Sequence, residues 1–427
     1  MIGLGRVGLA TGVGLAVQGH EVVCYDVDAA KVGSTNSGKQ PYHEPGLSKA
    51  LKRVVKTGRI IATVNPRESL RRSAFYFICV GTPPLDDGSM DSSFLASASK
   101  SIGGAIGGRR DHPVIVVKST VIPGTTEGVV APAIKSESGL TQQAFGLCVN
   151  PEFLREGTAF EDTMKPDRIV IGSIDKKSGD GLERIYFGFD CVKWRCDLRT
   201  AEMVKYATNS FLATKATFAN EIANMCNAFG LDSDKVLEGM ALDSRINPRY
   251  LVPGAGFGGS CLPKDVRAVI AASRRSGYEP RLLEAVIDFN ERQASRVVDI
   301  LREELGSLDG KRVAVLGLAF KAGTDDSRES RAVPIIRELL KSGAHVVVHD
   351  PAAKASELGG NLDVEVGASA ADALDGADGC IIQASWREYS ALGKTDFSRM
   401  RKPIVVDGRR TFDLKHLPEG VIYRRIG

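Results

Sequence analysis

Short runs of apolar, β-branched residues alternate with helix-like segments along most of the chain. The runs occupy residues 21–26, 75–80, 113–117 and 145–149 in the first half, and residues 312–316, 345–349, 379–383 and 404–407 in the last third. Each run ends in a polar or glycine-containing turn, and continuous apolar runs of this length are typical of parallel strands buried on both faces. The pattern predicts an α/β protein with two Rossmann-like, doubly wound domains, of which the second is the smaller.

A long helix is predicted between the two sheets. Residues 200–230 contain no proline, and their only glycine, Gly230, comes last. Such a helix has about 30 residues and a length of about 45 Å. Because one domain does not need this length, we expect the helix to join two domains and to supply the face of a homodimer. The predicted domains are residues 1–198, a central helical region at 199–300, and residues 301–427.

The glycine spacing near the start predicts a dinucleotide site. Residues 3–8 read GLGRVG, and the strand that follows the next helix ends in Asp26. Gly3 permits the tight turn, Gly5 lets a pyrophosphate approach the backbone, and Gly8 allows close packing of helix and strand. Asp26 is expected to accept the two ribose hydroxyls of NAD, and Lys31 to close over the same ribose.

The first predicted strand is unusually short, because only two residues precede Gly3. A central parallel strand usually has about five residues. We therefore expect the natural chain to begin a few residues upstream.

Polar residues follow three of the predicted strands of the first half. Thr82, Thr120, Glu152 and Glu156 each stand in the turn after a strand. Since ligands bind beyond the carboxyl ends of parallel strands, these four side chains are candidates for one crevice. Taken singly, each threonine is better explained as a helix cap and each glutamate as a solvated residue of a first helical turn.

The candidate nucleophile is Cys261, which lies in the glycine-rich stretch 254–265, GAGFGGSCLPKD. Pro263 suits the first position of a helix, so Cys261 is expected just before a helix N-terminus, where a thiolate is favoured. The competing interpretation is a small buried apolar residue. On the long helix, Lys205 and Asn209 are four residues apart and share a face, which makes them candidate donors to an oxyanion; an exposed lysine is the alternative.

The second sheet has a glycine turn that is not GxGxxG, GLAFKAG at residues 317–323. A second NAD is therefore less expected there than another phosphate-bearing ligand. Basic residues at or near the strand ends suit a diphosphate. They are Lys321, Arg328, Arg409 and Arg410.

Composition narrows the class of protein. The chain has 427 residues, 43% of them hydrophobic and 25% charged, with a formal net charge of +4. This mild charge gives no argument for nucleic acid. Its 8 cysteines form no CxxC pair and its 6 histidines stand singly, so neither disulfides nor a metal site is expected, which suits the cytoplasm. The apolar opening lacks the basic leader of a signal peptide, and no membrane association is expected.

The motifs taken together resemble one family. In order they are GLGRVG, VGTPP, KSTVIPGTT, NPEFLREGTAFED, AEMVKYATN, GFGGSCLPKD, GLAFKAGTDDSRES and VVDGRR. This order is similar to that of the nucleotide-sugar 6-dehydrogenases of the UDP-glucose/GDP-mannose dehydrogenase family. The resemblance covers nearly the whole chain and implies oxidation of a sugar C6 alcohol to a carboxylate in two NAD-dependent steps, through a cysteine-bound aldehyde and a thioester.

The resemblance also implies roles for single residues. Cys261 matches the nucleophile, Lys205 and Asn209 the groups that stabilise the oxyanion, and Asp265 the acid that works with the lysine and a water. Glu152 and Thr120 match the pair linked to that water and to proton transfer. Glu156 matches the carboxylate of thioester hydrolysis.

Binding residues are implied in the same way. Besides the three glycines and Asp26, the family pattern assigns to NAD the residues Lys31, Thr82, Thr120, Glu156 and Arg328. To the nucleotide sugar it assigns Glu152, Phe153, Leu154, Lys205, Asn209, Tyr250, Phe257, Gly258, Phe320, Lys321 and Arg409, with Arg245 reaching in from the partner subunit. One residue departs from the pattern, since Arg6 stands where the family usually has an aromatic residue.

Three functions remain open from the sequence. Oxidation of UDP-glucose is favoured by Arg245 and by residues 257–259. GDP-mannose or a UDP-N-acetylhexosamine is the alternative substrate, since the choice of nucleobase is poorly encoded. The third possibility, from a different class, is a silent NAD-binding dimer that binds cofactor without turnover.

Overall fold

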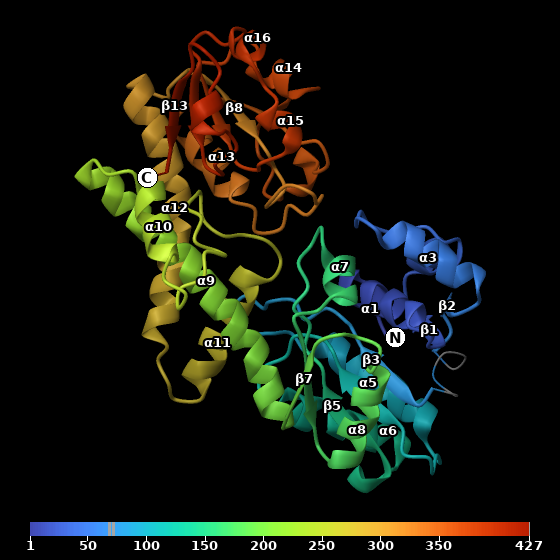
Figure 1. Cartoon of the computed structure of the whole chain (residues 1–427). Helices are drawn as coiled ribbons and strands as arrows, with labels where there is room; N and C mark the ends of the chain where they lie inside the picture. The colour runs from blue at the N-terminus through green and yellow to red at the C-terminus, as the bar shows by residue number, and fades with distance from the viewer. Residues whose placement is uncertain (67–69, 71–72, 427) are drawn as a thin grey trace. The chain divides into compact units, whose positions relative to one another are not determined.

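The computed structural model describes residues 1–66, 70 and 73–426. The chain divides into two compact units, residues 1–208 and residues 209–427. In Figure 1 the first unit runs from blue to green, and the second from green through yellow to red. Each unit is built on its own twisted sheet, so each is described by itself.

The sheet of the first unit has the strand order of a dinucleotide-binding fold. β3(Phe75–Ile78), β4(Val114–Val117) and β5(Gly146–Val149) pair in parallel, as do β1(Val22–Tyr25) and β2(Ile60–Thr63). Ile2 joins the two groups through parallel bridges to Tyr25 and Ile78. Counting Ile2 as the first strand, the order across the sheet is 3-2-1-4-5-6, the order of the two βαβαβ halves of this fold.

The remaining strands of the first unit depart from a purely parallel sheet. β6(Arg168–Ser173) runs antiparallel to β5, and β7(Val192–Cys196) is parallel to β6. The sequence prediction contained neither strand. An antiparallel edge added to a parallel sheet is common in doubly wound proteins.

Helices cover both faces of this first sheet. On one face Leu9, Leu51 and Leu182 are buried together, and on the other Leu95, Ile134 and Leu198. The helices of the unit are α1(Arg6–Val17), α2(Ala29–Asn36), α3(Leu47–Lys56), α5(Ser93–Ile106), α6(Ala131–Ser138), α7(Ala159–Met164) and α8(Lys176–Ile185), with a π-helical turn at Thr126–Val130.

The second unit repeats the architecture more regularly. Its described residues form a six-stranded, all-parallel sheet of order β10-β9-β8-β11-β12-β13. In chain order this is again 3-2-1-4-5-6. The strands are β8(Arg312–Leu316), β9(His345–His349), β10(Glu365–Val366), β11(Gly379–Ile382), β12(Ile404–Asp407) and β13(Ile422–Arg425).

One face of this second sheet carries α12(Arg281–Leu305) and α13(Ala332–Lys341), where Leu301 and Ile335 pack on Val313 and Val315. The other face carries α14(Ala370–Leu374), α15(Arg387–Ser390) and α16(Lys394–Phe397), where Tyr389 and Phe397 are fully buried. Burial on both faces explains why the strand sequences are continuously apolar rather than alternating.

The long helix predicted at 200–230 is α9(Leu198–Phe229), with 32 residues. It ends at Gly230, which has a φ of 69° and lies where the prediction placed the stop. Two shorter helices follow it, α10(Ser233–Ala241) and α11(Leu262–Arg275). The prediction of an α/β protein with two Rossmann-like domains and a long central helix is confirmed.

The packing of α12 gives a stability prediction. Leu301 is fully buried against the second sheet, whereas Leu282 on the same helix is 66% exposed. Leu301→Ala should lower the free energy of unfolding by about 2–5 kcal/mol, because it removes buried methyl groups and leaves a cavity. The control Leu282→Ala should change it by less than about 0.5 kcal/mol. Urea unfolding of both variants measures the effect, and equal shifts of their midpoints would contradict the packing.

Candidate active site

The glycine turn at the start of α1 has the shape that a pyrophosphate needs. Gly3 has a φ of 98°, and a Cβ on it would lie 2.7 Å from the carbonyl oxygen of Cys79. A Cβ on Gly8 would lie 1.9 Å from the carbonyl oxygen of Gly3, whereas one on Gly5 would meet nothing within 4 Å. Gly5 is the N-cap of α1, and neither a capping side chain nor an acidic residue occupies the first turn. The free N–H groups there suit an anion.

Asp26 ends the strand next to this turn and is 8% exposed. Its Oδ2 accepts a hydrogen bond from the N–H of Leu4 at 2.6 Å, and its Oδ1 accepts from the N–H of Asp28 at 2.9 Å. Each carboxylate oxygen keeps a second lone pair for a hydroxyl. Lys31, predicted to close over the ribose, has its Nζ 3.7 Å from Oδ2 of Asp28.

The second unit also has an acid that accepts backbone N–H groups of a glycine turn, but this acid has fewer free lone pairs for a ligand. Asp350 follows β9, as Asp26 follows β1, and its Oδ2 accepts from the N–H groups of Leu318 and Ala319 at 2.7 and 3.0 Å. The indole Nε1 of Trp386 donates to the same oxygen at 3.2 Å. Three donors on one oxygen leave it little room for a ribose hydroxyl, so the first unit is the better dinucleotide site.

Lys205 and Glu152 form a buried ion pair in the first unit. The lysine Nζ lies 2.9 Å from Oε1 of Glu152, and the side chains are 4% and 8% exposed. Glu152 also accepts from the N–H of Leu154 at 2.6 Å. Desolvation raises the pKa of Glu152, but the charge and hydrogen bond of Lys205 outweigh it and the pKa is lowered. The carboxylate is therefore held ionised beside an ammonium.

Phe153 lies between two cations of the same unit. The guanidinium carbon of Arg168 is 4.0 Å from its ring centroid, and Nζ of Lys205 is 5.5 Å away. Nearby in sequence, Glu156 lies 3.8 Å from Nε of Arg6. Thr82 donates to the backbone carbonyl of Thr120 at 2.9 Å, which links the ends of two predicted strands.

A second buried lysine was missed by the sequence prediction. Lys118 is 7% exposed, and its Nζ donates to Oδ1 of Asn150 at 2.8 Å. Tyr186 donates to the same oxygen at 2.6 Å. Desolvation lowers the pKa of Lys118 from its usual 10.5 to about 8, although Cys79 and Glu152 act in the other direction. The signal was in the motif KST, where only Thr120 had been considered.

In the second unit, Cys261 is the N-cap of α11, which starts at Leu262 with Pro263 in its first turn. The position just before the helix N-terminus is thus as predicted, although Pro263 is the second helical residue rather than the first. The thiol is half-buried, and its Sγ lies 3.6 Å from Oγ of Ser260. One helical turn on, Asp265 accepts from Nδ2 of Asn209 at 2.6 Å and pairs with Lys264 at 2.5 Å.

The other cysteines differ in environment from Cys261. Burial raises the pKa of the Cys24 and Cys196 thiols to about 11 and of the Cys79 and Cys148 thiols to about 12, and it also raises the pKa of Cys380. Such thiols stay protonated at neutral pH and are poor nucleophiles. Cys261 differs from these five thiols in being the N-cap of a helix, which makes it the better candidate among them.

Buried amide side chains hold the backbone of residues 254–261, the loop that leads to Cys261 and is called the cysteine loop below. Asn290 of α12 accepts from the N–H of Phe257 at 2.8 Å and donates to its carbonyl at 2.9 Å. Asn220 of α9 accepts from the N–H of Gly254 at 2.7 Å, and Gln293 of α12 donates to the carbonyl of Gly254 at 3.1 Å. The sequence prediction missed all three. Two amides three residues apart on α12, Asn290 and Gln293, were the available signal.

Arg409 links this loop to the second sheet. Its Nη1 donates to the carbonyl of Gly256 at 2.9 Å and its Nε to the carbonyl of Gln383 at 2.7 Å. Gly258 packs against Phe320, since a Cβ on it would lie 3.6 Å from the phenylalanine Cβ. Lys321 lies 5.4 Å over the Phe320 ring. Several residues predicted to bind the nucleotide sugar therefore gather around one loop.

Three predicted residues lie outside this arrangement. Arg245 is exposed and pairs with Asp243, and Arg328 is exposed and pairs with Asp326. Tyr250 is 37% exposed. Their predicted contacts, with a partner subunit, with NAD and with the sugar nucleotide respectively, stay predictions.

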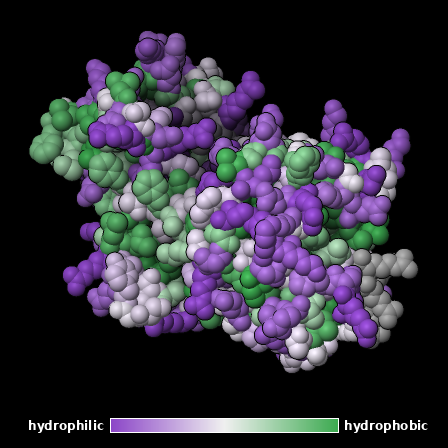
Figure 2. Space-filling view, turned by 60° about the horizontal axis from the view of Figure 1, so that its bottom comes forward, coloured by the Kyte–Doolittle hydropathy of each residue, from purple (hydrophilic) through white to green (hydrophobic). Residues whose placement is uncertain are grey.

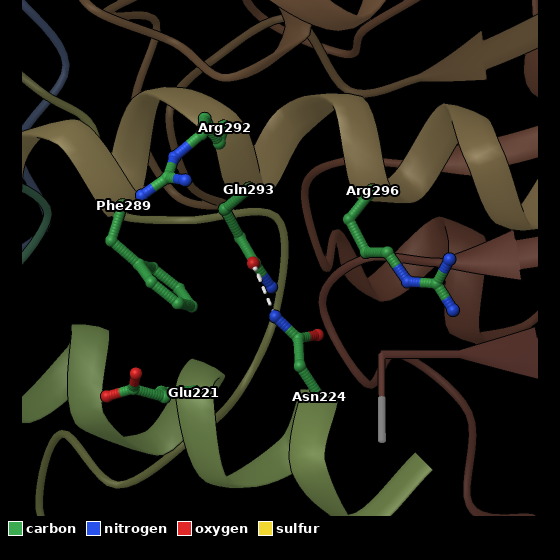
Figure 3. Close-up of a pocket in the computed structure, with 6 residues that line it drawn as sticks. All are labelled: Glu221, Asn224, Phe289, Arg292, Gln293 and Arg296. Atoms are coloured by element: carbon green, nitrogen blue, oxygen red, sulfur yellow. Dashed lines mark hydrogen bonds between the residues drawn. The ribbon is translucent and has the colours of Figure 1, made fainter. Parts of the chain in front are cut away.

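A shallow groove of about 350 Å³ lies between α9 and α12 (Figure 3). Asn224 donates to Gln293 across it at 3.0 Å, and Glu221, Phe289, Arg292 and Arg296 complete its lining. None of the site residues predicted from the sequence, all of which the structure describes, lines this groove. It is a packing gap between two helices and holds no candidate chemistry.

The described residues also lack two other kinds of feature. They contain no helix long and apolar enough to cross a membrane. They also contain no group of three or more histidine, cysteine or acidic side chains placed to hold a metal ion. Hydrophilic side chains cover much of the surface seen in Figure 2, with smaller apolar patches among them.

Comparison with protein-family models gives three matches along the chain. Residues 1–190 match the NAD binding domain of the UDP-glucose/GDP-mannose dehydrogenase family, residues 199–292 its central domain, and residues 314–414 its UDP binding domain. The three predicted domains stay a prediction, since the structure divides into two compact units, residues 1–208 and 209–427. The first match supports NAD as the cofactor inferred from the glycine spacing.

Individual proteins agree with these matches. The chain is 44% identical over 416 residues to the UDP-glucose 6-dehydrogenase of Haloferax volcanii, covering 96% of each chain. It is 40% identical to the GDP-mannose 6-dehydrogenase of Pseudomonas syringae, over 82% of this chain and 80% of that one. The solved structure of a UDP-glucose dehydrogenase from Pyrobaculum islandicum is 42% identical, with a TM-score of 0.91 over 99% of this chain and 96% of that chain.

The buried lysine of the first unit gives a pH prediction. Because the folded pKa of Lys118 lies near 8 and the unfolded value near 10.5, the unfolded chain binds more protons between these pH values. Stability should therefore rise with pH across this window, by about 3 kcal/mol relative to Lys118→Met. Urea unfolding at pH 7.5 and at higher pH measures the difference. If the free energies of unfolding of the wild type and Lys118→Met changed in the same way with pH, the prediction would be contradicted. The control is Lys52→Met, which changes an exposed lysine.

Proposed function

The chain belongs to the UDP-glucose/GDP-mannose dehydrogenase family, and on that basis we propose that it oxidises the C6 alcohol of UDP-glucose to a carboxylate. The observation that carries the proposal is the half-buried thiol of Cys261 at the N-terminus of α11, one turn from the Asp265–Asn209 hydrogen bond. Lys205 lies one helical turn before Asn209 on α9. A silent cofactor-binding dimer has no need of these groups.

NAD accepts one hydride in each of the two oxidation steps when it is bound. The residues proposed to hold it are Gly3, Gly5, Gly8 and Asp26, with Lys31, Thr82, Thr120, Glu156 and Arg328. The open space over Gly5 and the uncapped N-terminus of α1 fit a pyrophosphate. The acid at the end of β1 favours a cofactor with a free 2′-hydroxyl.

The first oxidation needs an acceptor for the alcohol proton and a donor to the oxygen that becomes negative. We assign the role of donor to Lys205 and Asn209. Lys205 is ion-paired with Glu152, and Asn209 donates a hydrogen bond to Asp265. Asp265 and an ordered water take the proton. The aldehyde formed is attacked by the Cys261 thiolate, so that a C–S bond forms and the aldehyde oxygen gains a proton. The covalent bond keeps the aldehyde from escaping.

The second oxidation converts the thiohemiacetal into a thioester, and water then cleaves it. The water oxygen adds to the carbonyl carbon, the C–S bond breaks, and Cys261 leaves as a thiolate. The water gives one proton to a carboxylate, which we assign to Glu156, and the product acid loses the other. Glu152 and Thr120 orient this water. Per sugar, one alcohol, one water and two oxidised cofactors give one carboxylate, two reduced cofactors and three protons.

For the nucleotide sugar we propose three groups of contacts. Glu152, Phe153 and Leu154 contact the sugar. The loop residues Phe257 and Gly258, together with Tyr250, contact the part of the ligand between its sugar and its nucleotide. Phe320, Lys321 and Arg409 bind the nucleotide. The 44% identity to a UDP-glucose 6-dehydrogenase favours UDP-glucose, and the 40% identity to a GDP-mannose 6-dehydrogenase keeps GDP-mannose as the alternative. A UDP-N-acetylhexosamine is a third candidate.

A panel of these nucleotide sugars with NAD, followed at 340 nm, tests the proposal. We expect two molecules of reduced cofactor per UDP-glucose and at least about a hundredfold lower kcat/KM for GDP-mannose. Faster turnover of GDP-mannose would make GDP-mannose the substrate and UDP-glucose the alternative. Cofactor binding without turnover of any sugar would instead support the silent dimer.

We also propose a homodimer that packs through α9. Phe211, Phe218 and Met225 are seven residues apart and therefore lie on one helix face, and they are 64%, 44% and 48% exposed. Exposed aromatic residues at this spacing support a protein interface. In such a dimer Arg245 of one subunit is assigned to the sugar nucleotide of the other. A cytoplasmic location is supported by the free state of all eight cysteines, each of which lies in the described chain.

The covalent route gives a sharp prediction for Cys261→Ser. This variant should lose the second oxidation, with kcat reduced about a thousandfold, because the hydroxyl is a far weaker nucleophile than the thiolate. Calorimetry should show binding of UDP-glucose within about threefold of the wild type. Cys191→Ser, which changes another half-buried thiol, is the control. A Cys261→Ser enzyme that forms two reduced cofactors per sugar at the normal rate would exclude the covalent route.

The dimer gives a second prediction. Phe218→Asp places a charge in the centre of the proposed interface and should shift the mass in sedimentation equilibrium from dimer to monomer, since an unpaired buried charge costs several kcal/mol. Asn227→Asp introduces the same charge at another exposed position of α9 and should leave the mass unchanged. An identical mass for Phe218→Asp and the wild type would place the interface elsewhere.

A further inference from the structure

Arg6 lies in the glycine turn of the first unit, and the structure gives it a defined environment. It is the first residue of α1, directly after Gly5, and its side chain is only 19% exposed. A long cationic side chain this deep in a glycine turn needs partners. Its partners come from two segments that are distant in sequence.

Three contacts hold the guanidinium. Its Nε lies 3.8 Å from Oε1 of Glu156, whose side chain is 13% exposed. Its carbon lies 5.0 Å from the ring centroid of Tyr42, and its Nη1 donates to the carbonyl of His43 at 3.2 Å. The Tyr42 hydroxyl in turn donates to the carbonyl of Arg6 at 3.2 Å. The side chain is thus fixed by an acid, an aromatic face and a backbone oxygen.

A second carboxylate lies in the same cluster. Glu44 is 1% exposed, and its Oε2 accepts from the N–H of Gly157, the residue after Glu156, at 3.2 Å. Its Oε1 is buried and has no hydrogen-bond partner among the residues that the structure describes. Two carboxylates on either side of Gly157 repel each other unless a cation lies nearby. The guanidinium of Arg6, which lies 3.8 Å from Glu156, supplies that charge, and an uncharged side chain could not.

We propose that Arg6 is a positioning residue that ties the Glu156 carboxylate to the glycine turn of the cofactor site. The proposal rests on the function proposed above, in which Glu156 takes a proton from the water that cleaves the thioester. Through Arg6, the orientation of this carboxylate depends on the same turn that binds NAD. Glu156 is one of nine residues proposed to hold NAD but the only carboxylate assigned to thioester hydrolysis. Loss of Arg6 should therefore slow thioester cleavage much more than it weakens cofactor binding.

The experiment compares the wild type with Arg6→Tyr, Arg6→Gln and Arg6→Lys. In Arg6→Tyr and Arg6→Gln, kcat should fall about tenfold to a hundredfold, because a misplaced catalytic group costs rate. KM for NAD should stay within about threefold, and a sugar thioester should accumulate on Cys261 in intact-mass spectra of quenched samples. Arg6→Lys, which keeps the charge, should recover most of the rate. Arg59→Gln removes another arginine of the same unit, paired with Glu21 at 3.7 Å on the surface, and should change nothing.

A double-variant cycle tests the coupling itself. Since Arg6 acts through Glu156, Arg6→Gln combined with Glu156→Gln should be no slower than Glu156→Gln alone. Additive losses would overturn the proposal. So would a rise of KM for NAD at unchanged kcat, which would make Arg6 an anchor for the pyrophosphate, and so would an unchanged rate. A wild-type protein that oxidises none of the nucleotide sugars defeats the proposed function itself, before any variant is compared.

Discussion

The backbone of the cysteine loop is fixed by hydrogen bonds from buried amides, and the rest of the proposed chemistry depends on this constraint. Residues 254–261 form no helix or strand, so their N–H and carbonyl groups have no regular partners. Asn220, Asn290 and Gln293 supply partners from two helices. Glycines in the loop allow the backbone to approach those amides and Arg409 closely. The result is a thiol held at a defined point in front of α11 without a rigid strand beneath it.

The same fold serves two ligands in the two units through small differences at equivalent places. Each sheet has the order 3-2-1-4-5-6, and in each an acid after the second strand binds the N–H groups of the first glycine turn. Asp26 keeps free lone pairs, whereas Asp350 is occupied by three donors on one oxygen. The matches to an NAD binding domain and a UDP binding domain follow the same division. The two sites therefore differ in how many hydrogen bonds the acid already accepts, and not in the order of their strands.

Much of this architecture could be predicted from the sequence because its signals are local. The apolar runs predicted β1, β3, β4 and β5 in the first unit and β8, β9, β11 and β12 in the second. Gly230 predicted the end of α9, and the spacing of GLGRVG predicted the cofactor turn. The edge strands β2, β7, β10 and β13 were missed because partly exposed strands lack a continuous apolar run. β6 was missed although it lies inside its sheet and contains the buried apolar run 169–171. Lys118, Asn290 and Arg6 were missed or unexplained for another reason. Their partners are 32, 33 and 150 residues away in sequence, and no local pattern records such contacts.

The central claim is that Cys261 holds the sugar covalently between its two oxidations. The most direct measurement is acid quenching of the wild-type protein shortly after it is mixed with UDP-glucose and NAD, followed by masses of all cysteine-containing peptides. The account predicts a transient UDP-sugar adduct on the peptide with Cys261 and unmodified masses for the other seven cysteines. An unmodified Cys261 peptide in samples taken throughout the first turnover, while reduced cofactor forms at the normal rate, would contradict it.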